Sequence, residues 1–185
     1  MNDNARPPAP TSPEPQDAAY WDATDEAREL LNEDRFKEAL VELRRVLEAD
    51  SSNGYAFYYT GVALYEIAEL APARDAYRAC LTTMPKHLGA RIAYAHVLRQ
   101  LGSHREALRE GLAALSQAPG DGDCLHAVGL AYHARGDMTS ARRYLDAFLE
   151  THPELEATLE VRTLLATMTA VDDFRDRRAS DDDGN

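Results

Sequence analysis

Small and large apolar residues recur along the middle of the chain with a period of 34 residues. Residues 20–155 divide without insertion into four blocks, 20–53, 54–87, 88–121 and 122–155. A period of this length indicates that each block is one supersecondary unit, and that neighbouring units stack to bury a continuous core. The sequence therefore predicts an all-α fold of four stacked helical hairpins.

Two positions in every block hold a small residue, the eighth and the twentieth. Antiparallel helices approach closely only where both present small side chains, so Gly61 and Ala73 can face each other within one hairpin. Larger residues then fill the space above and below. The eight structural repeat positions are Ala27, Ala39, Gly61, Ala73, Ala95, Ala107, Gly129 and Ala141.

Turn signals lie between the predicted helices. Proline stands at the thirty-second position of the last three blocks, where its missing amide hydrogen ends one helix or opens the next turn. Within the hairpins, Gly102-Ser103 and Gly136-Asp137 indicate a glycine that ends one helix and a polar cap that begins the next. Asp34-Arg35 and Ala68-Glu69 occupy the same places in the first two blocks, so those turns are less explicit.

This pattern resembles the tetratricopeptide repeat (TPR) family over the whole of residues 20–155. The family's usual glycine is replaced by Ala27 and Ala95, and Gly111 stands where a larger residue is usual. We expect Gly111 to loosen its helix by about 1 kcal/mol relative to alanine. The resemblance implies a right-handed α-solenoid of four TPR hairpins, in which the first helix of each hairpin lines a concave face.

The two ends of the chain differ from the repeats. Residues 1–19 are rich in proline and almost free of large apolar residues, which predicts a disordered leader. Residues 156–174 carry an apolar stripe at helical spacing, and we expect this helix to cap the last exposed core of the solenoid. Residues 175–185 are predicted to form a disordered acidic tail.

The resemblance also implies which positions line the concave groove, namely the second, fifth, ninth, twelfth and thirteenth of each block. In the first block these positions hold Trp21, Thr24, Arg28, Leu31 and Asn32. Tyrosine combines a large contact area with a hydrogen-bonding tip, so it suits a binding surface. The residues expected to bind a peptide in the later blocks are Tyr55, Tyr58, Val62, Tyr65, Ile92, His96, Arg99, His126, Leu130 and His133.

Such a groove suits an extended or helical peptide with one or two apolar anchors and an acidic group for Arg99. Tyr59 and Tyr77, by contrast, are expected to face the packed interior. Protonation of the groove histidines would add positive charge where the peptide docks, which raises the hypothesis of a groove sensitive to pH between about 5.5 and 7.5. His126 and His133 lie two turns apart, about 10 Å along one helix, so we predict no metal site.

Charge and composition limit which classes of partner and which cellular compartment we expect. The net charge is −12, but the first block holds ten acidic and five basic residues, whereas the second holds three of each. This excess of acidic residues repels phosphate, so we do not expect nucleic acid to be a partner. No apolar run approaches the roughly 20 residues that cross a bilayer, and the N-terminus lacks a secretory pattern. Two cysteines form no disulfide framework, so we expect a cytoplasmic protein in which Cys80 is an inert core thiol.

Catalytic and cofactor motifs are missing from the sequence. It contains no phosphate-binding glycine loop, nucleophile elbow or His-Glu-x-x-His helix, so we predict neither an enzyme nor a cofactor. The leading interpretation is a scaffold that binds a peptide segment of a partner protein. Two alternatives stay open. The chain is also similar to the class II chaperones of type III secretion, which hold an extended translocator segment, and it could self-associate into a structural homo-oligomer.

Overall fold

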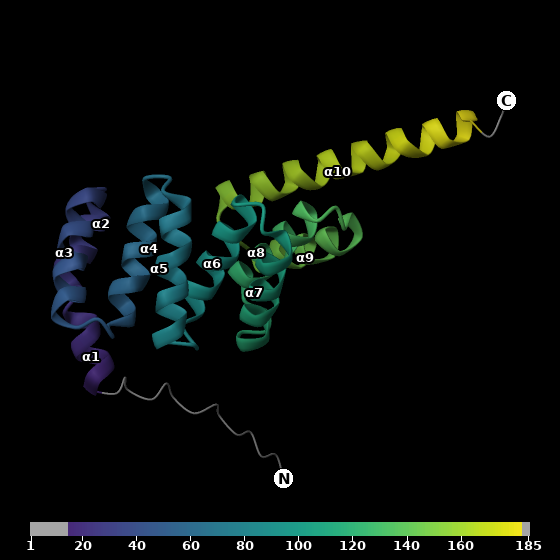
Figure 1. The fold of residues 1–185 in the computed structure, drawn as a ribbon. Helices are drawn as coiled ribbons and strands as arrows, with labels where there is room; N and C mark the ends of the chain where they lie inside the picture. Colours follow the sequence, from purple (N-terminus) through teal and green to yellow (C-terminus); the bar gives the residue numbers. More distant parts are fainter. Residues whose placement is uncertain (1–14, 183–185) are drawn as a thin grey trace, which may run out of the picture.

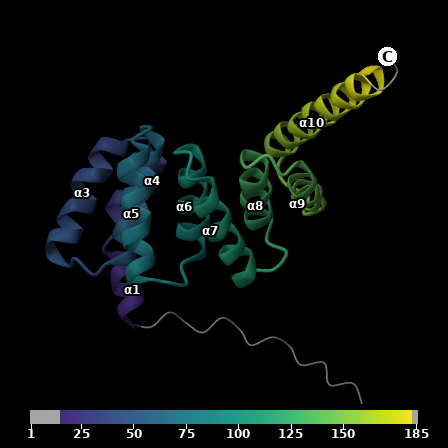
Figure 2. The same ribbon diagram turned by 45° about the vertical axis from the view of Figure 1, so that its right-hand side comes forward.

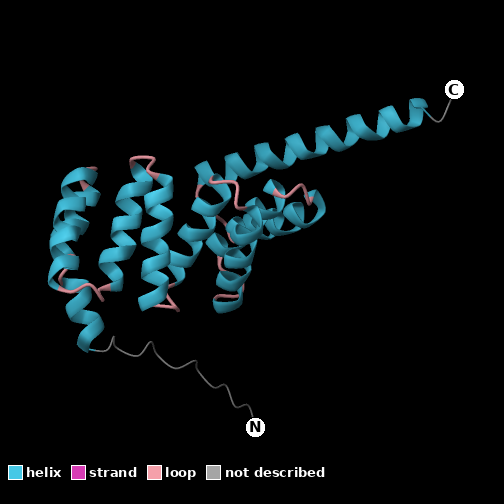
Figure 3. Cartoon of the chain, in the orientation of Figure 1, coloured by secondary structure: helices cyan, strands magenta, loops and turns pink. Residues whose placement is uncertain are grey.

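The computed structural model describes residues 15–182, which form ten α-helices and contain no strand. Helices α2 to α9 stand side by side as four antiparallel pairs, and α10 follows the last pair (Figures 1 and 3). The predicted all-α stack of hairpins with a terminal helix is therefore confirmed. The helices are α1 (Pro15–Asp22), α2 (Asp25–Asn32), α3 (Phe36–Ala49), α4 (Gly54–Glu66), α5 (Leu70–Thr83), α6 (Leu88–Gln100), α7 (His104–Gln117), α8 (Gly122–Ala134), α9 (Met138–Glu150) and α10 (Leu155–Asp182).

All eight of the predicted small positions are buried, and they let the two helices of each hairpin approach closely. A Cβ atom added to Gly61 would lie 2.5 Å from Cε1 of Tyr77, and one added to Gly129 would lie 2.7 Å from Cδ2 of Leu145. The glycine of α4 therefore packs against a large side chain of α5, and not against Ala73 as we expected. Its missing side chain makes room for the tyrosine ring.

The turn inside each hairpin has the same geometry in all four blocks. Its fifteenth residue is left-handed, with φ of 57° at Asp34, 61° at Ala68, 78° at Gly102 and 80° at Gly136. The amide of the following residue donates to a carbonyl five residues back, as from Glu69 to the oxygen of residue 64 at 2.8 Å. This pair of features is a Schellman motif, which satisfies the last carbonyls of the helix. The first two blocks thus adopt the glycine geometry without glycine.

The last residue of each of the first three blocks caps the helix that follows. The backbone amides of residues 56, 90 and 124 donate to the side chains of Asn53, His87 and Asp121 at 3.0, 3.0 and 2.9 Å respectively. Each of these bonds satisfies one of the free amides at a helix N-terminus. The predicted cap Asp137 accepts from the amide of Ser140 at 3.0 Å, whereas Ser103 stands at the cap position of α7 without a side-chain cap bond.

The first block departs from the predicted hairpin. Its first helix is broken at residues 23–24, where the hydroxyl of Thr24 donates to the carbonyl oxygen of Trp21 at 2.7 Å. The preceding piece, α1, begins at Pro15, so residues 15–19 are helical and the predicted disordered leader is wrong for them; residues 1–14 lie outside the described part. Asn53 anchors the break, because its side-chain amide donates to the carbonyl oxygen of Tyr20 at 3.0 Å.

The terminal helix caps the solenoid as predicted, but it is longer than expected. Val161, Leu165 and Met168 are buried against the α8–α9 hairpin and close its apolar core. The helix continues to Asp182, so the prediction of a disordered tail from residue 175 is wrong up to that point, and residues 183–185 lie outside the described part. Beyond its packed turns, α10 projects away from the other helices (Figures 1 and 2).

Gly111 has a packing role that the sequence did not reveal. A Cβ atom added there would lie 3.2 Å from Cγ2 of Val128 and 3.6 Å from its Cα atom, so glycine lets α7 approach the backbone of α8 closely. The expected loss of helix propensity is thus accompanied by tight contact between the third and fourth hairpins.

Both cysteines are fully buried, and burial raises the pKa of each thiol to about 12. This agrees with the interpretation of Cys80 as an inert core residue. Among residues 15–182, no helix is both long enough and apolar enough to cross a membrane.

Replacing Ala68 with glycine should stabilise the protein by roughly 0.5–1 kcal/mol, because alanine is strained at positive φ and glycine is not. Urea unfolding followed by circular dichroism measures the difference. The control is Ala166→Gly on the exposed side of α10, which should be destabilising, since glycine weakens a helix interior. A loss of stability in Ala68→Gly would contradict the claim that Ala68 is strained in its left-handed conformation.

Gly61→Ala should destabilise the protein by roughly 1–3 kcal/mol, because the added methyl group overlaps the buried ring of Tyr77. The double variant Gly61→Ala/Tyr77→Leu imitates the first block, where Ala27 and Leu43 share a core cluster. It should recover part of the loss in thermal melts. Equal destabilisation in the single and double variants would show that the close approach is not limited by this ring.

Candidate functional site

A pocket of about 480 Å³ lies between α2 and α4, the first helices of the first two hairpins. Several of its residues stand at positions expected to face the groove, including Tyr58 and Val62, which are half-buried. The pocket combines apolar surface with charged groups at its edge. The residues that line this α2–α4 pocket are Arg28, Leu31, Asn32, Asp34, Phe36, Tyr58, Tyr59, Val62 and Glu66.

An aromatic cluster joins this pocket to the end of α1. The ring of Trp21 makes edge contacts with Tyr55 and Tyr59, at centroid distances of 5.3 and 6.0 Å. The guanidinium of Arg28 lies 4.0 Å above the Trp21 ring in a cation–π arrangement, and it also pairs with Asp25. Trp21 nevertheless keeps 39% of its surface exposed, so a large aromatic face is available beside the pocket.

A second group, which we call the Arg99 cluster, consists of His96, Arg99 and His126 on α6 and α8. The rings of the two histidines lie 5.8 Å apart, and the His126 ring stacks on Phe148 of α9 at 4.7 Å. Burial is the main reason that the pKa of both histidines lies below its ordinary value, to about 4 for His96. The charge of Arg99 lowers both pKa values further, and His126 also lowers that of His96.

These pKa shifts bear on the hypothesis of a groove that responds to pH near neutrality. Burial lowers the pKa of His96 to about 4, because the packed α6–α8 face disfavours its charged form. This direction argues against His96 as the sensor, and the pH dependence of peptide binding stays a prediction. For His126, the carboxylates of Glu160 and Asp123 oppose the lowering of the pKa without cancelling it.

The remaining predicted groove residues do not all join these two sites. Tyr65 accepts a hydrogen bond from the side-chain amide of Gln100 at 2.6 Å, so its hydroxyl links α4 to α6. Leu130 packs on the core of the α8–α9 hairpin and α10. Ile92 and His133 are half-buried on α6 and α8.

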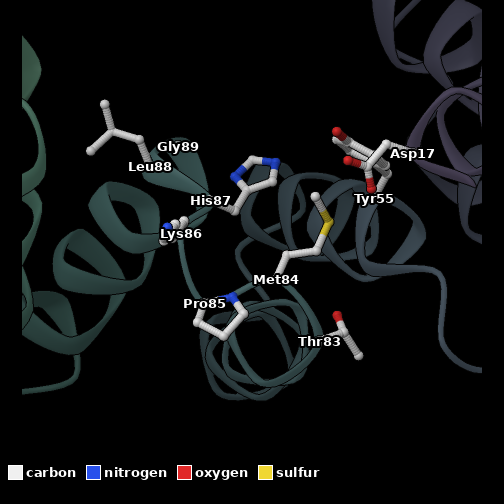
Figure 4. A pocket seen from close by; sticks show the side chains of 9 residues that line it. All are labelled: Asp17, Tyr55, Thr83, Met84, Pro85, Lys86, His87, Leu88 and Gly89. Carbon is white, nitrogen blue, oxygen red and sulfur yellow. The ribbon is translucent and has the colours of Figure 1, made fainter. Parts of the chain in front are cut away.

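Tyr55 lines a different pocket, of about 600 Å³, at the N-terminal ends of α4 and α6. Figure 4 shows the His87 ring inside it, with Tyr55 and Asp17 on the side of α4 and α1. The ring centroid of His87 lies 5.8 Å from that of Tyr55 and 4.6 Å from that of Tyr58. The pocket also carries Lys86, so charges of both signs stand at its rim.

Three expectations about single residues need correction or completion. Tyr77 is buried as predicted, with 2% of its surface exposed, whereas Tyr59 is half-buried: it packs against the core cluster of Ala27 and Leu43 and also lines the α2–α4 pocket. Thr24 is completely buried at the helix break, so it does not line the groove. We did not predict from the sequence that His87 caps a helix. Its position at the end of a block, which is also the position of the cap residue Asn53, could have indicated this role.

Several buried nitrogen atoms at groove positions have no hydrogen-bond partner among the described residues. They are Nε of Arg28, Nε of Arg99 and Nε2 of His126. Buried polar atoms are nearly always paired in folded proteins, so these three atoms are exceptions within the described fold. Among the described residues, no group of three or more histidine, cysteine, aspartate or glutamate side chains is arranged to hold a metal ion.

Comparison with known proteins supports the repeat assignment. A family model for the tetratricopeptide repeat matches residues 55–87 and 123–154, which are the second and fourth blocks to within one residue at each end. No curated protein matches the chain.

Solved structures share the fold at low sequence identity. MamA 41-end from Desulfovibrio magneticus RS-1 is 20% identical and aligns with a TM-score of 0.73 over 91% of this chain and 92% of its own. A tetratricopeptide repeat protein from Parabacteroides merdae is 18% identical, with a TM-score of 0.71 over 82% of this chain and 59% of its own. A thermophilic TPR protein from Thermus thermophilus, TTC0263, is 20% identical, with a TM-score of 0.65 and 82% of each chain covered.

The fold thus places the chain in the class of α-solenoid proteins built from helical hairpins. Its second and fourth blocks match the tetratricopeptide repeat model. At identities this low the solved structures show the fold alone.

His87→Asn should reduce the loss of stability on acidification, because asparagine can cap α6 at any pH. Burial lowers the pKa of His87 below its ordinary 6.5 in the folded state, so the unfolded chain binds the extra proton first. The contribution of His87 to stability is therefore present above about pH 6.5 and is lost as the pH falls through the folded pKa. Urea unfolding of both proteins at about pH 7.5 and 5 checks this, and an equal loss in both would contradict it.

Proposed function

We propose that the chain is a scaffold that holds a peptide segment of a partner protein along the face formed by α2, α4, α6 and α8. The observation that carries this proposal is the α2–α4 pocket, which gathers Arg28, Leu31, Tyr58 and Val62 from two hairpins. An exposed aromatic face at Trp21 adjoins it. Aromatic and aliphatic surface with a few polar groups is typical of sites that anchor peptide side chains.

The Arg99 cluster extends this face by two hairpins. The hydrogen bond between Tyr65 and Gln100 connects the two parts, and both residues stand at groove-facing positions of adjacent hairpins. A segment that follows the face from α2 to α8 would meet apolar anchoring surface first and nitrogen-bearing side chains later. That order suits an extended or helical peptide better than a compact small molecule.

Two more specific functions stay predictions. A secretion chaperone would hold an extended translocator segment on this same face, and a structural protein would hold another copy of the chain. The exposed Leu155 and Leu159 on the first turns of α10, 73% and 54% exposed, offer a further apolar contact for a second copy. Light scattering of the purified chain distinguishes the homo-oligomer from the monomeric adaptor.

Leu31→Glu should weaken peptide binding, because it places a charge in the apolar part of the α2–α4 pocket. Peptides selected from a random library displayed on phage serve as probes, with their C-termini fused to the coat protein. Binding of the resynthesised peptides is followed by the fluorescence of Trp21, which is the single tryptophan of the chain. We expect affinity to fall by roughly tenfold or more.

The matched control is Val41→Glu, which introduces the same charge at an apolar residue of α3 that is 49% exposed and outside the pocket. It should bind the selected peptides as the unaltered chain does, and circular dichroism should show equal helicity in both variants. Failure of the library to yield any binding peptide, or equal binding by Leu31→Glu, would overturn the proposed function.

A further inference from the structure

Arg99 is a half-buried arginine without a counter-ion. Several arginines of the described residues pair with nearby carboxylates, as Arg91 does with Glu110 at 2.7 Å and Arg35 with Glu38 at 2.6 Å. Within the described residues, by contrast, Arg99 forms no ion pair, and its buried Nε atom has no hydrogen-bond partner. The chain carries 32 acidic residues, so the missing partner does not reflect a shortage of carboxylates.

The surroundings of Arg99 make the lack of a counter-ion unfavourable in free energy when no ligand is bound. A partly desolvated guanidinium is stabilised chiefly by a carboxylate or by several hydrogen bonds. Its neighbours are instead two imidazoles, His96 and His126, whose own charged forms the site disfavours. The Nε2 atom of His126 is also buried and unpaired, so two side chains of adjacent hairpins each have a nitrogen atom without a hydrogen-bond partner.

The acidic residues closest to this cluster do not supply the missing acceptor. Glu160 of α10 and Asp123 of α8 influence the pKa of His126, but neither approaches Arg99 within the 4.0 Å of an ion pair. Asp123 stands on the side of His126, towards the start of α8 and the start of α10. The guanidinium therefore stays available to a ligand on the α6–α8 face.

We propose that the Arg99 cluster receives the carboxylate of an aspartate or glutamate side chain of the bound peptide. Arginine matches a carboxylate through two parallel N–H donors. This inference rests on the proposed function, and it names the chemistry of the partner: a segment with an apolar anchor for the α2–α4 pocket and an acidic residue for the Arg99 cluster.

The test begins with the peptides selected by the unaltered full-length chain. Because their C-termini are fused to the coat protein, any carboxylate they offer comes from a side chain. We expect an aspartate or glutamate to be enriched at one position relative to the apolar anchor. Synthetic peptides with amidated C-termini then compare that residue with its amide, and the glutamate peptide should bind roughly tenfold more tightly than the glutamine peptide.

Substitution of Arg99 locates the effect on this cluster. Arg99→Gln should bind the glutamate and glutamine peptides equally, whereas Arg105→Gln, at an exposed arginine of α7, should keep the full preference. Arg99→Glu should reverse it and prefer a peptide with lysine at the acidic position. Arg99→Glu is therefore a second, independent test of the cluster if Arg99→Gln folds poorly.

The possible results separate the two proposals. Peptides that bind and depend on Leu31 but show no acidic preference would overturn the inference and leave the scaffold function standing. An acidic preference that persists in Arg99→Gln would place the carboxylate elsewhere and overturn the inference as well. If the library yields no binding peptide, both proposals fail together.

Discussion

The close approach of two helices at the eighth position of each hairpin is the constraint on which the rest of the structure depends. Gly61 and Gly129 have no side chain there, and a large residue of the opposite helix fills the space. The hairpin can then close tightly, and the turn between its helices must be short enough to keep them in register. The left-handed residue at position fifteen meets this requirement in every block, even where it is Asp34 or Ala68.

The joints between hairpins follow a second regularity. Asn53, His87 and Asp121 end their blocks, and each accepts a hydrogen bond from the first turn of the next helix. The start of α4, α6 and α8 is thereby set relative to the preceding hairpin, and these helices present their groove positions on one face. Because the cap is a local bond, its chemistry can vary, and at the second joint it depends on a neutral imidazole.

The proposed binding face is not uniform along its length. At α2 and α4 it is a pocket with aromatic walls, whereas at α6 and α8 it presents Arg99 and two histidines whose charged forms the fold disfavours. Apolar burial behind these helices stabilises the folded state. This stabilisation offsets the free-energy cost of leaving the buried nitrogen atoms of the face without hydrogen-bond partners. If the proposed function holds, such a surface would distinguish among partners by charge and anchor them by apolar contact.

The sequence by itself determined the repeat. Small residues, turn residues and prolines act through neighbours a few positions away or at the same place in the next block, so their spacing predicted the hairpins, their number and the terminal helix. Tertiary structure alone decided the break at Thr24, the length of α10, the tight contact at Gly111, and the division of the groove into a pocket and the Arg99 cluster. These features depend on which side chains meet across different helices. Neither the missing counter-ion of Arg99 nor the lowered pKa of His96 can be inferred from residue spacing, because each depends on the desolvation and the neighbours that packing creates.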